Sequence, residues 1–333
     1  MRINQLLSNK IKIAGLICTM MVLYRHSLNY LAFFNSWTGV GISGKVEDFC
    51  SLLTEIAVPY FFIISGFFFF RISYTVDDYL WMIKKKFHSL FIPFVFWNVI
   101  GAGVLLFIDA GKIGDSLLSC ITNLLRSDWY GPLWYVRDLM ILMLLYPVYG
   151  WLFRVNNGIL YTVCILISFF YWIPVDSSIL STESILFFLI GGVLSNYPKA
   201  FEYRLPLWSL CLLAFVWFST CAHIIPILSV YMHRMNILIG VVVFWQLLNF
   251  LGERVRCCII PLTEYSFLLY VMHAYPMKAI KRLAGAVFYG NDVAALLTYL
   301  FLPLLVAMLI YYVGRVCKRF FPHAFSIVLG GRS

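Results

Sequence analysis

The chain has 333 residues, of which 62% are hydrophobic and only 12% charged, and its formal net charge is +10. A chain this apolar has too little polar surface to stay dissolved as a globular protein, and its composition is that of a polytopic membrane protein. The positive charge does not indicate a nucleic acid partner, because the basic residues stand in short segments between apolar runs.

Windows of about 20 apolar residues predict an all-α fold with about ten transmembrane helices. The predicted spans are 11–32, 51–71, 89–108, 132–152, 158–174, 183–196, 206–224, 234–251, 261–278 and 292–316. The sixth is short for a full span, so we expect it to be tilted or broken. No internal repeat occurs, and no polar stretch is long enough for a separate soluble domain. We therefore expect one integral-membrane domain over residues 1–333.

The distribution of lysine and arginine predicts the orientation in the bilayer. An even number of spans puts both termini on one side, and most basic residues of the short loops then fall on that side, which predicts cytoplasmic termini. Lys278, Lys281 and Arg282 run against this trend, so they mark either a functional opening or an error in the ninth span. The first apolar run lacks a small-x-small cleavage site, and we expect a retained span rather than a signal peptide.

Cysteine and glycine patterns exclude several kinds of site. Apart from the pair Cys257 and Cys258, the nine cysteines stand singly and show no zinc-ligand spacing. The sequence therefore predicts no metal site and no disulfide framework. It also lacks a P-loop and a glycine-rich dinucleotide fingerprint.

Three ionisable residues fall inside predicted spans at similar depth: His26, Arg137 and His273. With a rise of about 1.5 Å per residue, His26 lies about 21 Å beyond Lys12 and reaches the outer half of the first span. An intramembrane ionisable group costs several kcal/mol unless it is paired or faces a wet cavity, so each is a candidate for function. Histidine has a pKa suited to general-base catalysis near neutral pH, which favours His26 most.

Each of these residues also has a structural interpretation. Arg25 and His26 are also consistent with the interfacial end of the first helix. Arg137 forms either part of a site or a structural ion pair with Asp138. His273 is either a contact in a site or a hydrogen-bond donor to a neighbouring helix.

A second group of candidates lies in and directly after the phenylalanine-rich second span. The step Ser65-Gly66 leaves room for either a close helix or a ligand. The cations that follow it, in a predicted cytoplasmic loop, are Arg71, Lys84, Lys85 and Lys86. They serve either as a topology signal or as a site for the phosphates of a nucleotide-containing donor.

Four segments, in this order, resemble the membrane acyltransferase family 3: Tyr24 to Ser27, Pro59 to Phe67, Leu133 to Arg137 and Ser266 to His273. The second segment matches the Pro-aromatic-Phe-Phe-x-x-Ser-Gly-Phe run of the family. The first helix of the family carries Arg or Lys, ten residues and then His. This chain departs from that spacing, because Gly15 holds the position and the nearest upstream cation is Lys12.

The resemblance implies transfer of an acyl group, mostly acetyl, from cytoplasmic acyl-CoA to a hydroxyl of a cell-surface or lipid-linked glycan, in the inner membrane of a bacterium. Acetyl-CoA is then a substrate, and no permanently bound cofactor is expected. Under this interpretation Arg71 and the three lysines hold the nucleotide of the donor, and its thioester arm passes Ser65 and Gly66. His26 acts as general base or as an acyl-carrying nucleophile, Arg137 stabilises the oxyanion and His273 supplies a second polar contact.

Two other classes of function use the same residues. A carrier or flippase for a glycan or anionic substrate would bind with the buried cations and carry out no chemistry. Transporters often show paired, Gly/Pro-interrupted helices from repeated halves, and this sequence shows no such pairing. A sensor or assembly protein that has kept only the fold is the third alternative, and the absent cation at position 15 favours it.

Overall fold

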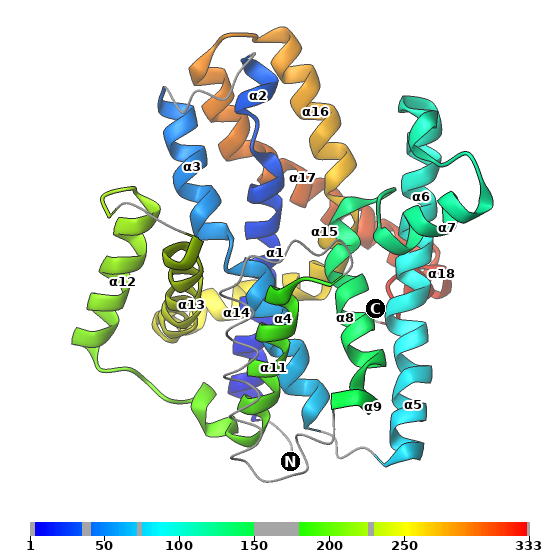
Figure 1. The fold of residues 1–333 in the computed structure, drawn as a ribbon. Coiled ribbons are helices and arrows are strands. Elements are labelled where there is room, and N and C mark those ends of the chain that lie inside the picture. Colours follow the sequence, from blue (N-terminus) through cyan, green and yellow to red (C-terminus); the bar gives the residue numbers. More distant parts are fainter. Residues whose placement is uncertain (1–3, 35–40, 72–74, 150–179, 226–229, 332–333) are drawn as a thin grey trace. The chain divides into compact units, whose positions relative to one another are not determined.

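The computed structural model describes residues 4–34, 41–71, 75–149, 180–225 and 230–331 (Figure 1). Every regular element among them is helical and none is a strand, which confirms the prediction of an all-α fold. The predicted fifth span, 158–174, lies outside the described residues. The chain groups into two compact units, the first comprising Met1–Phe61 and Lys199–Arg315 and the second Phe62–Pro198 and Val316–Ser333.

The helices of the first unit gather around its N-terminal helix. They are α1 (Gln5–Ser27), α2 (Tyr30–Phe33), α3 (Ile42–Thr54), α12 (Leu207–Cys221), α13 (Val230–Leu247), η6 (Leu248–Phe250), α14 (Glu253–Ile259), η7 (Ile260–Tyr265), α15 (Ser266–Met272) and α16 (Ala274–Val287). Helix α1 contacts α3, η7, α15 and α16, and it buries Ile13, Ala14, Cys18 and Leu23. It begins at Asn4, whose side chain accepts a hydrogen bond from the backbone N–H of Leu7 at 2.7 Å.

The helices of the second unit surround α8. They are α5 (Val76–Lys86), η1 (Phe87–Phe91), α6 (Ile92–Ile108), η2 (Ala110–Lys112), α7 (Leu117–Arg126), η3 (Gly131–Leu133), α8 (Trp134–Leu144), α9 (Tyr146–Tyr149), α11 (Thr182–Asn196) and α18 (Pro322–Val328). Helix α8 contacts α5, α7, α9 and α11. Three elements carry the chain from one unit into the other: α4 (Ala57–Phe70), η5 (Pro198–Phe201) and α17 (Asp292–Phe320).

Six helical stretches among the described residues are long and apolar enough to cross a membrane. They are Gln5–Phe33, Ile42–Phe70, Val76–Ile108, Tyr231–Phe250, Glu253–Met272 and Asp292–Phe320. Helices α7, α11 and α12 are apolar but shorter. The predicted count of about ten spans is therefore not confirmed.

Several boundaries differ from the predicted ones for local reasons. The second predicted span is divided at residues 55–56, between the end of α3 and the start of α4. The ninth is interrupted at His273, so α15 ends there and α16 continues the helical path to Val287. Lys278, Lys281 and Arg282 consequently lie on a helix that the predicted span cut short.

The prediction that Lys84, Lys85 and Lys86 occupy a loop is wrong. A capping box at Thr75 starts α5, because the Thr75 side chain and Asp78 satisfy each other's backbone N–H groups. The lysines form the last turn of α5, and η1, a π-helical turn, joins that turn to α6 without a break. Lysine is a good helix former, so a charged run alone does not end a helix.

Candidate functional site

The C-terminal end of α1 carries the first candidate residue, His26, and is contacted by α16. The last carbonyl groups of a helix have no intrahelical partner. Lys281 of α16 supplies one, because its Nζ donates to the carbonyl oxygen of Leu28 at 2.8 Å and to that of His26 at 3.3 Å. A cation at this position also interacts favourably with the helix dipole. The half-buried ammonium thus fixes the turn that presents His26.

The electrostatic environment of Lys281 reflects its position on α16, against the C-terminal end of α1. Burial lowers the pKa of this lysine, and the neighbouring Glu47 opposes that shift, whereas Lys278 and Arg282 add to it. Glu47 is fully buried and accepts a hydrogen bond from the backbone N–H of Asn29 at 2.9 Å. Asn29 in turn donates through Nδ2 to the carbonyl oxygen of Ala295 at 3.0 Å. The residues after His26 are therefore held from three helices.

The structure brings His26 and His273 together. Their ring centroids are 5.0 Å apart and the ring planes are inclined by 48°. The two imidazoles differ in burial, since His26 is exposed and His273 is fully buried. The sequence predicted similar depth in the bilayer for His26, Arg137 and His273, which stays a prediction; the structure shows the ring contact of the two histidines within the first unit. Lys278 of α16 is a charged neighbour of both rings.

The hydrogen bonds of His273 identify its neutral tautomer. Its Nδ1 lies 2.8 Å from the carbonyl oxygen of Tyr270 and 3.2 Å from that of Leu269. A carbonyl oxygen only accepts, so Nδ1 carries the proton and Nε2 carries the lone pair. That Nε2 is buried and has no hydrogen-bond partner among the described residues. A buried acceptor beside the ring of His26 is thus available to a proton-bearing group.

A charged network lies one residue before His26. Arg25 is 3.5 Å from Glu55 and also donates to the hydroxyl of Ser51, while Glu55 is 3.0 Å from Nε2 of His233 on α13. The network joins α1 to the break between α3 and α4 and to α13. The sequence singled out Arg25 but not its partners, because residues this far apart in the chain carry no common spacing.

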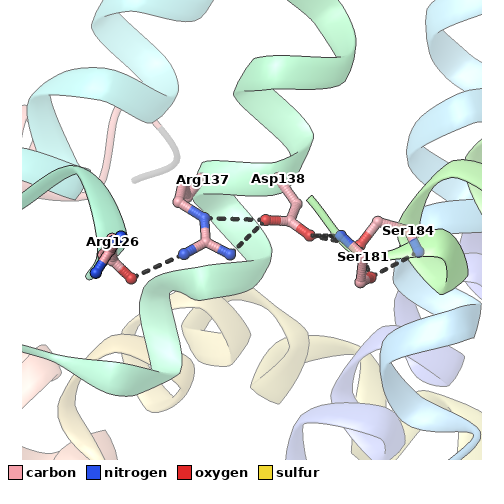
Figure 2. Close-up of polar contacts among 5 residues, drawn as sticks. All are labelled: Arg126, Arg137, Asp138, Ser181 and Ser184. Atoms are coloured by element: carbon pink, nitrogen blue, oxygen red, sulfur yellow. Dashed lines mark hydrogen bonds and ion pairs between the residues drawn. The ribbon is translucent and has the colours of Figure 1, made fainter. Parts of the chain in front are cut away.

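Arg137 lies in the second unit and pairs with its neighbour in the chain, as Figure 2 shows. Its Nε and Nη2 donate to Oδ1 of Asp138 at 3.0 and 2.8 Å, and Nη1 donates to the carbonyl oxygen of Arg126 at 2.8 Å. The carboxylate of Asp138 is fully buried. Its Oδ2 accepts from the hydroxyl of Ser184 at 2.7 Å and from the backbone N–H of Ser181 at 3.2 Å. The pair therefore joins α7 and α8 to the first turn of α11.

Ser65 and Gly66 lie on the part of α4 that belongs to the second unit. The hydroxyl of Ser65 is 2.9 Å from that of Tyr135 on α8. A Cβ added to Gly66 would lie 2.0 Å from the carbonyl oxygen of Phe188, and one added to Gly191 would lie 2.0 Å from that of Ile63. The two glycines thus let α4 and α11 cross in backbone contact. Of the two alternatives that the sequence left open for this space, a close helix occupies it here.

The four predicted phosphate-binding cations also lie in the second unit. Arg71 follows α4, with its guanidinium 5.1 Å from the ring of Phe67. Lys84 and Lys85 are exposed, Lys86 is half-buried, and the ammonium of Lys85 lies 5.0 Å from the ring centroid of Trp81. The predicted site residues therefore fall into two sets, His26 with His273 in one unit and the remaining residues in the other.

A protein family matches most of the chain. A family model, acyltransferase family 3, described as an acyltransferase domain, matches residues 14–312. Among curated proteins, the chain is similar to the succinoglycan biosynthesis protein ExoH of Rhizobium meliloti (strain 1021), with 27% identity over 156 residues. That alignment covers 43% of this chain and 41% of the relative, so the match spans less than half of either protein. No solved structure matches the chain.

Proposed function

This chain belongs to acyltransferase family 3, and we propose that it transfers an acetyl group from acetyl-CoA to a hydroxyl of a surface or lipid-linked polysaccharide. The matched residues, 14–312, include His26, His273 and the Arg137 segment. The polysaccharide acceptor is suggested by the name of the relative, a succinoglycan biosynthesis protein. The family and the six apolar helices support a location in a bacterial inner membrane, with both termini in the cytoplasm as the basic loops predict.

The observation that supports this function best is the contact between His26 and His273. An exposed imidazole beside a buried one suits proton transfer, because the outer ring reaches substrate while the inner ring is held by backbone carbonyls. His26 removes the proton of the acceptor hydroxyl, whose oxygen attacks the thioester carbonyl. The C–S bond then breaks, the sulfur leaves as the thiolate of CoA, and the proton held by His26 passes to it. The ring of His273 packs against that of His26 and orients it for this transfer.

In this proposal the ion pair of Arg137 with Asp138 holds α7 and α8 against the first turn of α11. Three of its nitrogens donate to Asp138 and to the carbonyl of Arg126, which supports the structural alternative. A guanidinium has five N–H donors, so donors remain for an oxyanion, and that role stays a prediction. Arg71, Lys84, Lys85 and Lys86 remain candidates for the donor nucleotide, supported by the exposure of Lys84 and Lys85.

The experiment that tests the function compares the surface polysaccharide of wild-type and deletion cells by mass spectrometry. We expect the deletion to remove the mass of one acetyl group from each modified repeat, with chain length and export unchanged. Complementation with the wild-type gene should restore the mass. Loss of the polysaccharide from the surface, with acetylation intact in what remains, would contradict acyl transfer and favour a carrier.

A further inference from the structure

Three cations meet near the N-terminal end of α1, at the opposite end from His26. Lys10 of α1 has Arg204, which precedes α12, and Arg256 of α14 as its charged neighbours. All three belong to the first unit, and the sequence places all three on the predicted cytoplasmic side. We call Lys10, Arg204 and Arg256 the α1 cation cluster.

Neutral groups hold this cluster in place. Nζ of Lys10 donates to Oδ1 of Asn249 at 2.8 Å and lies 3.9 Å from the ring centroid of Trp245. Arg256 donates through Nη2 to the backbone carbonyl of Asn249 at 3.3 Å. Asn249 therefore joins two of the three cations. The face of the Trp245 ring adds a cation–π contact with the ammonium of Lys10.

The segment that carries Arg204 is fixed on α13. Gln246 donates through Nε2 to the carbonyl oxygen of Tyr203 at 2.9 Å and accepts from the backbone N–H of Leu205 at 3.4 Å. Its Oε1 also accepts from Nδ2 of Asn249 at 3.1 Å. One amide network thus holds the side chains of Lys10 and Arg256 and the backbone on either side of Arg204 before any ligand arrives, which reduces the ordering cost of binding.

The cluster lacks a counter-charge. Within the residues that the structure describes, neither Lys10 nor Arg204 nor Arg256 lies within 4.0 Å of a carboxylate. The nearby carboxylate of Glu202 accepts a hydrogen bond from Asn4 instead. Like charges held together repel, and an anion that paired with all three would relieve that repulsion. Arginine forks match phosphate oxygens bidentately, so the two arginines favour a phosphate over a single carboxylate.

The position of the cluster on α1 relates it to the histidines. Lys10 and His26 lie on one uninterrupted helix, about 24 Å apart along its axis at the usual rise per residue. An acyl-CoA carries its phosphates at one end of a long pantetheine arm and its thioester at the other. A donor lying along α1 therefore places its phosphates at one end of the helix and its acyl carbon at the other.

We propose that the α1 cation cluster binds the phosphate groups of the acyl donor. This inference rests on the proposed function, since it takes acyl-CoA as the donor. It places the phosphate site in the same unit as His26 and His273, as an alternative to the lysines of α5. The same chemistry would also recognise the phosphate of an anionic lipid headgroup, so the experiment has to separate these two sources.

The test measures binding of coenzyme A and of pantetheine to the full-length protein in detergent, by isothermal titration calorimetry. Arg204→Gln is the first variant, because Arg204 is exposed and forms no hydrogen bond in the described structure. The second variant is Arg204→Gln with Arg256→Gln. Arg254→Gln is the matched control, because it removes an exposed charge of α14 from outside the cluster. We expect coenzyme A affinity to fall about tenfold for each cluster charge removed, with no change for pantetheine.

Each outcome decides the proposal. Wild-type protein that binds neither compound would overturn both the proposed donor and this site. Wild-type protein that binds coenzyme A, with every variant equal to Arg254→Gln, would overturn the site alone. Phosphatidylglycerol retained by wild type and lost by the cluster variants in native mass spectrometry, with coenzyme A affinity unchanged, would assign the cluster to lipid and overturn its role in donor binding.

Discussion

At the residue scale, the exposure of His26 separates its chemistry from its contribution to stability. Its side chain is exposed and its ring contacts one buried imidazole, so removing it should leave folding nearly intact. We expect His26→Ala to lower acyl transfer at least about 10²-fold, as loss of a general base does. Acetylation of the surface polysaccharide and the amount of protein in the membrane are the two measurements.

His323→Ala is the control for this variant, since His323 is an exposed histidine on α18 in the second unit. The two variants should reach the same membrane level, and only His26→Ala should lose transfer. Acetylation above about a tenth of the wild-type level in His26→Ala would make His26 a structural residue.

His273→Asn separates the two ring nitrogens of His273. The Asn amide N–H₂ replaces Nδ1–H as donor to the carbonyls of Leu269 and Tyr270, whereas nothing replaces Nε2. We expect a melting temperature close to that of wild type and a kcat lowered at least about tenfold, because His26 loses its orienting partner. An unchanged kcat would show that His273 only fixes the helix bend.

The sequence alone singled out His26 and His273 as candidates at similar depth, but it did not predict their contact or their partners. A histidine inside an apolar run is conspicuous, because it is costly there without a reason. Glu47 and Asn29 lie in segments where polar residues are ordinary, and Lys281 stood out only because its charge runs against the trend of the loops. Their roles depend on which helices pack together, which residue spacing does not reveal.

At the element scale, the crossing of α4 and α11 depends on the absence of side chains at Gly66 and Gly191. A Cβ at Gly66 would lie 2.0 Å from a backbone oxygen of α11, so the helices would have to separate. We expect Gly66→Val to lower stability by about 1–3 kcal/mol or more, as overpacked helix contacts do. Gly103→Val on α6 is the control, because an added Cβ there meets nothing within 4 Å. Thermal unfolding in detergent measures both.

Ser65→Ala completes this comparison. It keeps the helix crossing and removes only the hydroxyl contact with Tyr135, which is worth about 1 kcal/mol. Gly66→Val should therefore be the less stable of the two variants. If Gly66→Val were as stable as Ser65→Ala and no longer bound donor, the space at Gly66 would belong to the ligand rather than to α11.

The first turn of α11 depends on Asp138. Its buried carboxylate accepts from Arg137 on one side and from Ser181 and Ser184 on the other (Figure 2). Asp138→Ala leaves a largely buried guanidinium without its partner, which costs about 3–5 kcal/mol. Arg137→Met should cost less, because the two serines still satisfy part of the carboxylate. Unfolding temperatures in detergent that placed Arg137→Met below Asp138→Ala would contradict this order.

Element boundaries were the least predictable part of the fold. Hydropathy detects a long apolar run but not a break inside it, so the interruptions at residues 55–56 and at His273 gave no signal. The lysines of α5 fall between two apolar windows, so hydropathy alone places them in a loop. In the structure the capping box at Thr75 starts α5 before the lysines, and the π-helical turn η1 continues the helix after them.

At the scale of the whole molecule, the basic loops predict cytoplasmic termini. A reporter fused after Ser333 should be active only in its cytoplasmic form, and one inserted at Gly111, in a predicted outside segment, only in its periplasmic form. Periplasmic activity of the C-terminal fusion would show that the protein has the opposite orientation. The α1 cation cluster would then face away from cytoplasmic acyl-CoA.

The fold class followed from composition, whereas the number of spans did not. Six described stretches satisfy the length and hydropathy of a span, and α11 and α12, which correspond to predicted spans, are shorter than a bilayer requires. A hydropathy window cannot tell a short buried helix from a full crossing, because both are apolar.

The second unit needs residues from the C-terminal part of the chain, beginning at Val316 near the end of α17, which are synthesised last. Helix α18 packs on α6, and a Cβ at Gly330 would lie 2.4 Å from the carbonyl oxygen of Ser89 in η1. Residues 316–331 thus belong to the unit that begins at Phe62, although the ribosome makes them after every residue of the other unit. The second unit stays incomplete in the translocon until these residues emerge. A nonsense codon directly after Arg315 would therefore preserve both histidines and the α1 cation cluster and yet leave α6 without its last packing partner.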